Sequence, residues 1–269
     1  MISILLPAYK ANKLLHEVFV PGLKNVWNEH KVEVLLWDNG GNEEFLNQLS
    51  IRSDVHPDCL RVFGTGENIG LNKALNLLAK EAEGEYFYLP HTDMIMLPGC
   101  LEALVKEVKN LPPTSYLLCS RSIEPGFSHI PSQIIKDYGN DVNTFQKDKL
   151  MAEYRQYVEK KVVVNARMPF FLHRKLWERI GGVDENYFSY CTDDDLIQQC
   201  YDAGVRRFWM VGESLVYHLQ GKSNQQQTVD RDSQKPYEYF VEKWKKKYPD
   251  VHHPGQYHPK LIPFETRIK

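Results

Sequence analysis

Apolar, β-rich runs alternate with amphipathic helical patterns through the first 120 residues of this chain of 269 residues. Runs typical of strands lie at 2–6, 32–37, 60–63, 86–89 and 116–120. Between them, residues 71–82 and 101–108 place leucine, valine and alanine on one helical stripe. This alternation is typical of βαβ units. It predicts an α/β fold with a Rossmann-like, mostly parallel central sheet that carries helices on both faces.

The composition excludes several classes of protein. The 33 basic and 35 acidic residues give a net charge of -2, so no overall field favours a specific nucleic-acid partner or an anionic membrane. The five cysteines show no CxxC pair and no zinc-ligand spacing, and their odd number fits reduced thiols. No signal-peptide pattern and no run of 18 apolar residues is present. We therefore expect a soluble, cytoplasmic protein.

The pattern changes after residue 120. Residues 123–161 read as an insertion over the site, with a polar helix at 144–159. A strand at 168–172, helices at 174–180 and 193–203, and strands at 206–211 and 214–217 follow. We expect one domain at 1–222, with a nucleotide-binding half at 1–120 and an acceptor or catalytic half at 121–222. Residues 223–269 then form a C-terminal extension, with a polar linker and a helical tail packed on the domain.

The aromatic and lysine-rich tail permits two interpretations. It could make peripheral contact with a membrane-borne acceptor, through the lysines at 245–247. Alternatively, Tyr239, Phe240 and Trp244 lie on one helical face and could pack the tail on the domain.

Two acids follow strands of the predicted sheet, where ligands bind in open α/β folds. Asp38 ends the second strand and could accept hydrogen bonds from a base or ribose, or could hold the following Asn-Gly-Gly turn. Asp93 comes after the apolar strand at 86–89, and a carboxylate there needs a partner such as a metal ion. Otherwise Asp93 caps the helix that begins near Pro98.

The glycine loop from Gly64 to Gly70 is similar to a dinucleotide-binding loop, with a strand before it and a helix after it. However, this loop belongs to the third βα unit, and the charged Glu67 lies where backbone would approach a pyrophosphate. No acid ends a strand about 20 residues later in the ribose role. An oxidoreductase is therefore disfavoured.

Three adjacent acids, Asp193, Asp194 and Asp195, open the helix at 193–203. They could simply complement the helix dipole. Their mutual repulsion could also keep one of them basic enough to accept a proton. His218 ends the last strand, before Gln220 and Lys222, and an imidazole with a nearby cation suits a metal-bound diphosphate.

Taken together, these segments resemble the inverting family 2 glycosyltransferases, which have the GT-A fold, in both order and spacing. The resemblance covers about residues 1–222. The segments that carry it are ISILLPAYK (2–10), VEVLLWDNG (32–40), NIGLNKALN (68–76), GEYFYL (84–89), GGVDE (181–185), TDDDL (192–196) and VYH (216–218).

The resemblance implies a role for each matched residue. Asp193 would be the general base, with Asp194 as the possible substitute. Asp93 and His218 would bind a divalent cation, Mn²⁺ or Mg²⁺. A nucleotide-sugar donor of the UDP, dTDP or GDP type would contact Pro7, Tyr9, Asp38, Asn68, Lys73, His91 and Thr92. The acceptor would be a glycan or another hydroxyl-bearing molecule.

Two residues depart from the family pattern. His91 stands where the family has the first acid of Asp-x-Asp, so it binds either the metal or the ribose. Thr192 replaces the glutamate that precedes the base. The altered motif His91-Thr92-Asp93 leaves open a catalytically silent sugar-nucleotide or glycan-binding module. A nucleotidyltransferase would need a glycine-rich, basic phosphate loop after the first strand, and the segment from Pro7 to Lys10 is not one.

Overall fold

The computed structural model describes residues 1–49, 60–126, 133–164, 166–220, 235–249 and 266–268. Their strands form one sheet in the order β11-β8-β10-β6-β9-β4-β1-β2-β3, with β5 paired to β10 and β7 to β6. The strands are β1 (Ile2–Ala8), β2 (Val32–Asp38), β3 (Leu60–Phe63), β4 (Tyr86–Leu89), β5 (Met94–Met96), β6 (Tyr116–Glu124), β7 (Ile134–Ile135), β8 (Lys161–Val164), β9 (Phe170–His173), β10 (Arg207–His218) and β11 (Thr266–Ile268).

Within these residues, β5, β8 and β9 run opposite to the other strands. The helices are α1 (Asn12–Leu14), α2 (Val20–Val26), α3 (Glu43–Leu49), α4 (Leu71–Glu81), α5 (Cys100–Val108), α6 (Lys147–Glu153), α7 (Arg174–Ile180), α8 (Thr192–Asp202) and α9 (Lys235–Lys245). A π-helical turn (Leu15–Phe19) joins α1 to α2. The predicted α/β class and mostly parallel sheet are confirmed.

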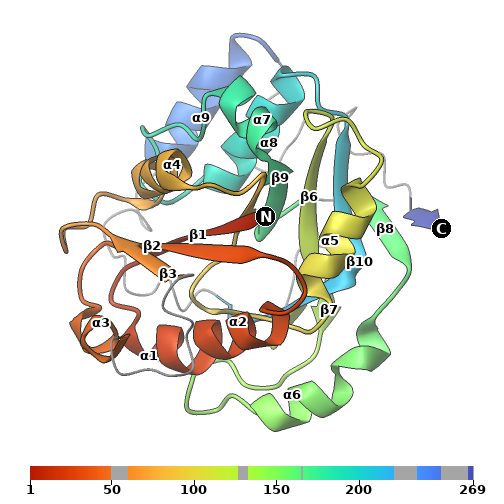
Figure 1. Cartoon of the computed structure of the whole chain (residues 1–269). Coiled ribbons are helices and arrows are strands. Elements are labelled where there is room, and N and C mark those ends of the chain that lie inside the picture. Colours follow the sequence, from red (N-terminus) through yellow and green to blue (C-terminus); the bar gives the residue numbers. More distant parts are fainter. Residues whose placement is uncertain (50–59, 127–132, 165, 221–234, 250–265, 269) are drawn as a thin grey trace.

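Helices cover both faces of the sheet (Figure 1). Helices α1, α2 and α3 lie on one side of β1 to β3, while α4 lies on the other side, together with α7, α8 and α9. Along β1, Ile4 and Leu6 enter one buried cluster and Leu5 enters the other, as the alternation of side chains along a strand requires. Apolar residues at consecutive positions of β1 are therefore explained by burial on both faces.

Two parts of the sequence prediction need correction. The helix expected at 144–159 is shorter, comprising α6 and a 3-10 turn (Tyr154–Tyr157). Thr144 belongs to the preceding loop, because its hydroxyl accepts hydrogen bonds from the backbone N–H groups of Asn140 and Asp141. The two strands expected at 206–211 and 214–217 are one strand, β10, with an irregularity between Val211 and Leu215. The expected linker at 222–234 lies outside the described residues.

No helix among the described residues is both long enough and apolar enough to cross a membrane.

Candidate active site

Two chain segments meet at the carboxyl edge of the sheet through a short β ladder. The turn at 91–93 follows β4 and leads into β5, which pairs antiparallel with the end of β10. In this ladder His218 lies opposite Met94. One residue further on, the backbone N–H of Leu219 donates to the carbonyl of Asp93 over 3.0 Å. Main-chain hydrogen bonds therefore place His218 beside Asp93.

His91, Asp93 and His218 could together hold a metal ion. Each offers one ligand atom, and these atoms lie within 4.8 Å of one another. The Asp93 side chain is fully buried, and its Oδ2 lies 3.5 Å from Nε2 of His218. The rings of the two histidines are 6.3 Å apart between centroids. Two imidazole nitrogens and one carboxylate oxygen are suitable ligands for a divalent transition metal.

Asp93 does not cap the following helix. Helix α5 is capped instead by Glu29, whose carboxylate accepts from the backbone N–H groups of Gly99 at 2.5 Å and of Leu101 and Glu102 at 3.0 Å. Glu29, which is distant in the sequence, therefore caps the N-terminus of α5. This is the role that the alternative interpretation gave to Asp93.

Glu124 at the end of β6 orients His218. Its Oε1 lies 3.0 Å from Nδ1 of His218, and the same carboxylate accepts from the side-chain amides of Gln133 and Gln220. Because a carboxylate accepts hydrogen bonds, Nδ1 of His218 carries the proton in this contact. Nε2 is thereby turned toward Asp93, in the carboxylate–histidine arrangement common around bound metals.

The two histidines differ in their electrostatics. Burial lowers the pKa of His91, and the charges of Asp93 and Asp193 oppose this only in part. Burial also lowers the pKa of His218, but the carboxylates of Asp93 and Glu124 outweigh burial and raise that pKa to about 10. The protein thus places a positive charge between two carboxylates, and a divalent cation would meet the same electrostatic demand.

Asp193 borders this group of ligands. It lies in the first turn of α8, and its Oδ2 accepts from the backbone N–H of Met168 over 3.3 Å. The thioether of Met168 in turn lies 2.9 Å from Nε2 of His91. Asp194 instead pairs with Arg167 at 3.5 Å. Asp193 is therefore linked through Met168 to His91, whereas Asp194 pairs with Arg167.

Asp38 supports the turn after β2. Its Oδ1 accepts from the backbone N–H of Gly40 at 2.9 Å and from the amide of Asn42 at 2.6 Å. A Cβ on Gly64 would lie 2.5 Å from the carbonyl oxygen of Asp38, and a Cβ on Gly66 would come within 3.9 Å of Asp38 Oδ2. The glycines of this loop thus allow close approach between the ends of β2 and β3.

The remaining predicted donor residues occupy different settings. The side chain of Asn68 accepts from the backbone N–H of Gly70 at 3.1 Å and so shapes the loop before α4. Pro7 and Tyr9 are half-buried at the end of β1, while Thr92 is buried between His91 and Asp93. Lys73 is exposed in the first turn of α4.

The sequence reading missed Glu124, Arg167 and Met168. Glu124 ends β6, whereas the sequence predicts that this strand ends at residue 120. The sequence therefore does not show that Glu124 lies at a strand end. Met168 opens the run at 168–172 that the sequence predicts only as an apolar strand, and Arg167 directly precedes that run.

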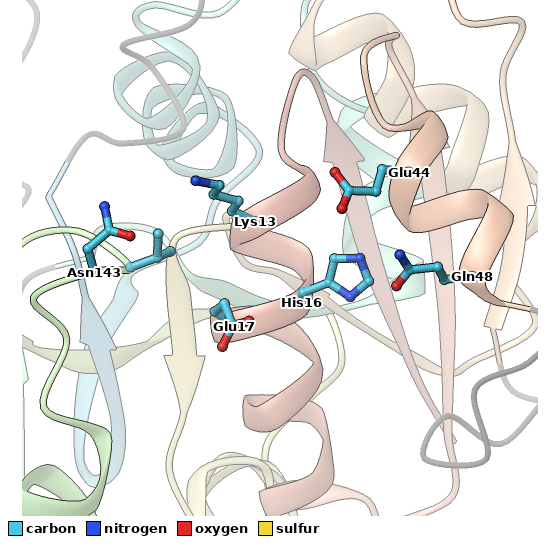
Figure 2. A pocket seen from close by; sticks show the side chains of 7 residues that line it. Lys13, His16, Glu17, Glu44, Gln48 and Asn143 are labelled. Carbon is cyan, nitrogen blue, oxygen red and sulfur yellow. The ribbon is translucent and has the colours of Figure 1, made fainter.

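A separate pocket of about 480 Å³ lies over the helices that follow β1 and β2 (Figure 2). It is lined by Lys13, His16, Glu17, Glu44, Gln48, Val142 and Asn143. None of these is a predicted site residue. Its mixed charges specify no ligand.

Comparison with known proteins identifies a family. A family model described as Glycosyl transferase family 2 matches residues 3–181, about two thirds of the chain. None of the curated proteins matches this chain.

Several solved structures share the fold. S. aureus TarS 1-349 is 14% identical, with a TM-score of 0.58, over 82% of this chain and 61% of that one. Mannosyltransferase PcManGT from Pyrobaculum calidifontis, in complex with GDP-Man and Mn²⁺, is 18% identical with a TM-score of 0.57, over 97% and 67%. GalNAc-T7, with UDP, GalNAc and Mn²⁺, is 16% identical with a TM-score of 0.63, over 93% and 49%. This chain thus spans about three fifths of TarS 1-349. At these identities the likeness shows the GT-A fold.

Proposed function

Because this chain belongs to glycosyl transferase family 2, we propose that it transfers a sugar from a nucleotide-diphosphate donor to an acceptor hydroxyl, with inversion. The observation that supports the proposal is that Asp193 accepts a hydrogen bond from Met168, whose thioether contacts His91, one of the three residues that could hold a cation. A proton acceptor next to a candidate diphosphate-binding cation site is the arrangement that such a transfer needs.

The cation proposal extends to His91, which we assign to the metal rather than to the ribose. A bound divalent cation would neutralise the charge that develops on the leaving nucleoside diphosphate. Mg²⁺ prefers oxygen ligands, whereas imidazole suits transition metals. The two histidines therefore favour Mn²⁺ over Mg²⁺. Two structures of the same fold, PcManGT and GalNAc-T7, were solved with Mn²⁺.

In this proposal Asp193 takes the proton from the acceptor hydroxyl as that hydroxyl attacks the anomeric carbon from the side opposite the diphosphate. The hydrogen bond from Met168 holds one carboxylate oxygen, and the other would take the proton. Asp194 is less suited to this role, because its carboxylate pairs with Arg167 at 3.5 Å.

The donor-side roles remain proposals of the same kind. We assign the nucleotide to the edge formed by the ends of β1, β2 and β3, with Pro7, Tyr9, Asp38, Asn68, Lys73 and Thr92 as its contacts. Asp38 would offer Oδ2, since Oδ1 is held by the turn. Residues 1–222 would be the catalytic domain, and 121–222 its acceptor half.

A thermal-shift panel tests the function. UDP, dTDP and GDP, and their sugars, are each added with Mn²⁺, with Mg²⁺ or with EDTA. A ligand at 100 times its Kd stabilises the native state by about 2.7 kcal/mol. For a chain of this size, that corresponds to a Tm increase of roughly 5 °C. We expect one nucleotide to give this shift with Mn²⁺ and a smaller one with Mg²⁺.

Nucleoside monophosphates are the control for the panel, because they lack the diphosphate. The nucleotide sugar with the largest shift is then incubated with Mn²⁺, and release of nucleoside diphosphate is followed. Stabilisation without any such release would indicate a silent binding module. No stabilisation by any diphosphate would contradict the proposed function itself.

Glu124 gives a test of the metal site that does not depend on turnover. We expect Glu124→Ala to weaken Mn²⁺ binding about 10- to 100-fold, measured by EPR, because His218 loses the group that orients it. Glu124→Gln keeps an acceptor oxygen and should retain most of the affinity. Glu213→Gln is the matched control, since Glu213 is an acid of β10 that pairs with Lys106. Unchanged Mn²⁺ affinity in Glu124→Ala would refute the orienting role.

A further inference from the structure

The C-terminal helix α9 packs beside the helix that carries the candidate base (Figure 1). Phe240 and Trp244 of α9 are buried in a cluster with Tyr187 and Cys191. Cys191 immediately precedes α8. Helix α9 and the start of α8 thus share one small apolar core, and this part of the chain lies beyond the residues that match the family model.

A buried carboxylate joins the two helices. Asp195 of α8 is 1% exposed. It accepts hydrogen bonds from the hydroxyl of Tyr187 at 3.2 Å, the indole N–H of Trp244 at 2.7 Å and the ammonium of Lys243 at 2.9 Å. Lys243 also reaches Asp184 at 2.7 Å, so one cation bridges two acids.

This junction is held by charge as well as by packing. Burial raises the pKa of Asp195, which Lys243 and Trp244 counteract only in part. For Asp184 the balance is opposite: burial raises its pKa, but Lys243 and the backbone of Asn186 outweigh burial and lower it. Removing one partner of such a buried pair leaves an uncompensated charge. We call the hydrogen bonds of Lys243 and Trp244 to Asp195, and of Lys243 to Asp184, the α9 anchor. This α9 anchor resists movement of α8 away from α9.

The first turn of α8 has no side-chain cap of its own. Its N-cap residue, Cys191, has a φ of 63° and forms no side-chain cap hydrogen bond. Thr192 instead donates to Asn72 of α4 at 2.7 Å, and Asp195 is held by α9. Asp193 lies between these two attachments. Its own hydrogen bond to Met168, at 3.3 Å, is longer than either of them.

We propose that Lys243 and Trp244 are positioning residues for Asp193, acting through Asp195 to fix the rotation of the first turn of α8. The proposal rests on the proposed function, in which Asp193 is the base. A rotation of that turn would move the Asp193 carboxylate away from Met168 and from the acceptor. Displacement of a reacting group by about 1 Å can cost on the order of 100-fold in rate.

The test uses Lys243→Met and Trp244→Phe in the full chain, assayed with Mn²⁺ and the nucleotide sugar that gives the largest thermal shift. We expect kcat for nucleoside diphosphate release to fall about 10- to 100-fold, with donor KM and diphosphate affinity within twofold of wild type. Lys243→Arg should restore part of the rate. Lys246→Met is the matched control, because Lys246 of the same segment pairs only with the exposed Glu242 in the described contacts.

Stability is measured for each variant, and assays are run well below its Tm. Trp244→Phe keeps an aromatic ring and removes the N–H donor, so it separates positioning from packing. Unchanged kcat in both variants, or a parallel loss of donor affinity, would overturn the positioning role. If the wild-type protein releases no diphosphate from any donor, the proposed function itself fails. That result differs from a failure of the positioning role, in which the wild type is active and both variants keep its kcat.

Discussion

Asp193→Asn should abolish transfer, with kcat reduced about 1,000-fold or more and Kd for the nucleoside diphosphate with Mn²⁺ changed less than twofold. A positioned general base contributes about 10²- to 10⁴-fold to such reactions. The amide of asparagine keeps the size of the side chain and can still accept the hydrogen bond from Met168. The loss therefore reports on proton transfer. It is measured by steady-state kinetics and by calorimetric titration of the diphosphate.

Asp194→Asn is the matched control. Asp194 lies one residue away in the same turn and pairs with Arg167, so its variant should keep most of the rate. If Asp194→Asn loses the rate and Asp193→Asn does not, the two acids have exchanged roles. If neither variant loses the rate, the proposed base is wrong.

Asp93→Ala should remove the metal site, weakening Mn²⁺ binding more than about 100-fold and eliminating the metal-dependent thermal shift of the diphosphate. Asp93 supplies the one carboxylate of the three candidate ligands and is fully buried. Without it, two imidazoles would have to hold the cation at the edge of the sheet. EPR of free Mn²⁺ measures the loss, and circular dichroism shows whether the variant folds.

Two further variants separate the ligands. His91→Ala should weaken Mn²⁺ binding less than Asp93→Ala does, because one neutral ligand is lost. His91→Asp should retain binding and shift the preference toward Mg²⁺, since it replaces nitrogen by oxygen. Mn²⁺ affinity that survives in Asp93→Ala would show that the cation binds elsewhere, and unchanged affinity in His91→Ala would return His91 to the ribose.

The first half of the fold could be predicted because its signals are local. Strands β1 to β4 are apolar runs bounded by turns, and the stripe on α4 repeats with the helical period. Strand β5 escaped prediction because its three residues are too few to show a period, and only the pairing with β10 makes them a strand. The helix predicted at 144–159 is too long, because composition does not show that the hydroxyl of Thr144 accepts hydrogen bonds from backbone N–H groups of the preceding loop.

Candidate site residues stand out in the sequence where one residue carries its own signal, as Asp93 does after a predicted strand. They were not predictable where the signal lies in a distant partner. Glu124 is 94 residues from His218, and Lys243 is 48 residues from Asp195. No local pattern links residues so far apart. Asp38 is a different case, because its partners Gly40 and Asn42 are close in the sequence. These contacts support the turn role, and the base-reading role of Asp38 stays a prediction.

In the ladder between β5 and β10, main-chain pairing sets the position of a candidate metal ligand, and the side chain sets its chemistry. Hydrogen bonds of the main chain set His218 opposite Met94, and they do not depend on the side chains that project from those positions. An acid and an imidazole could therefore replace one another at position 218 without loss of this main-chain pairing. For the proposed cation site, single substitutions would change the metal preference, while the main-chain pairing of β5 with β10 would keep the position of residue 218.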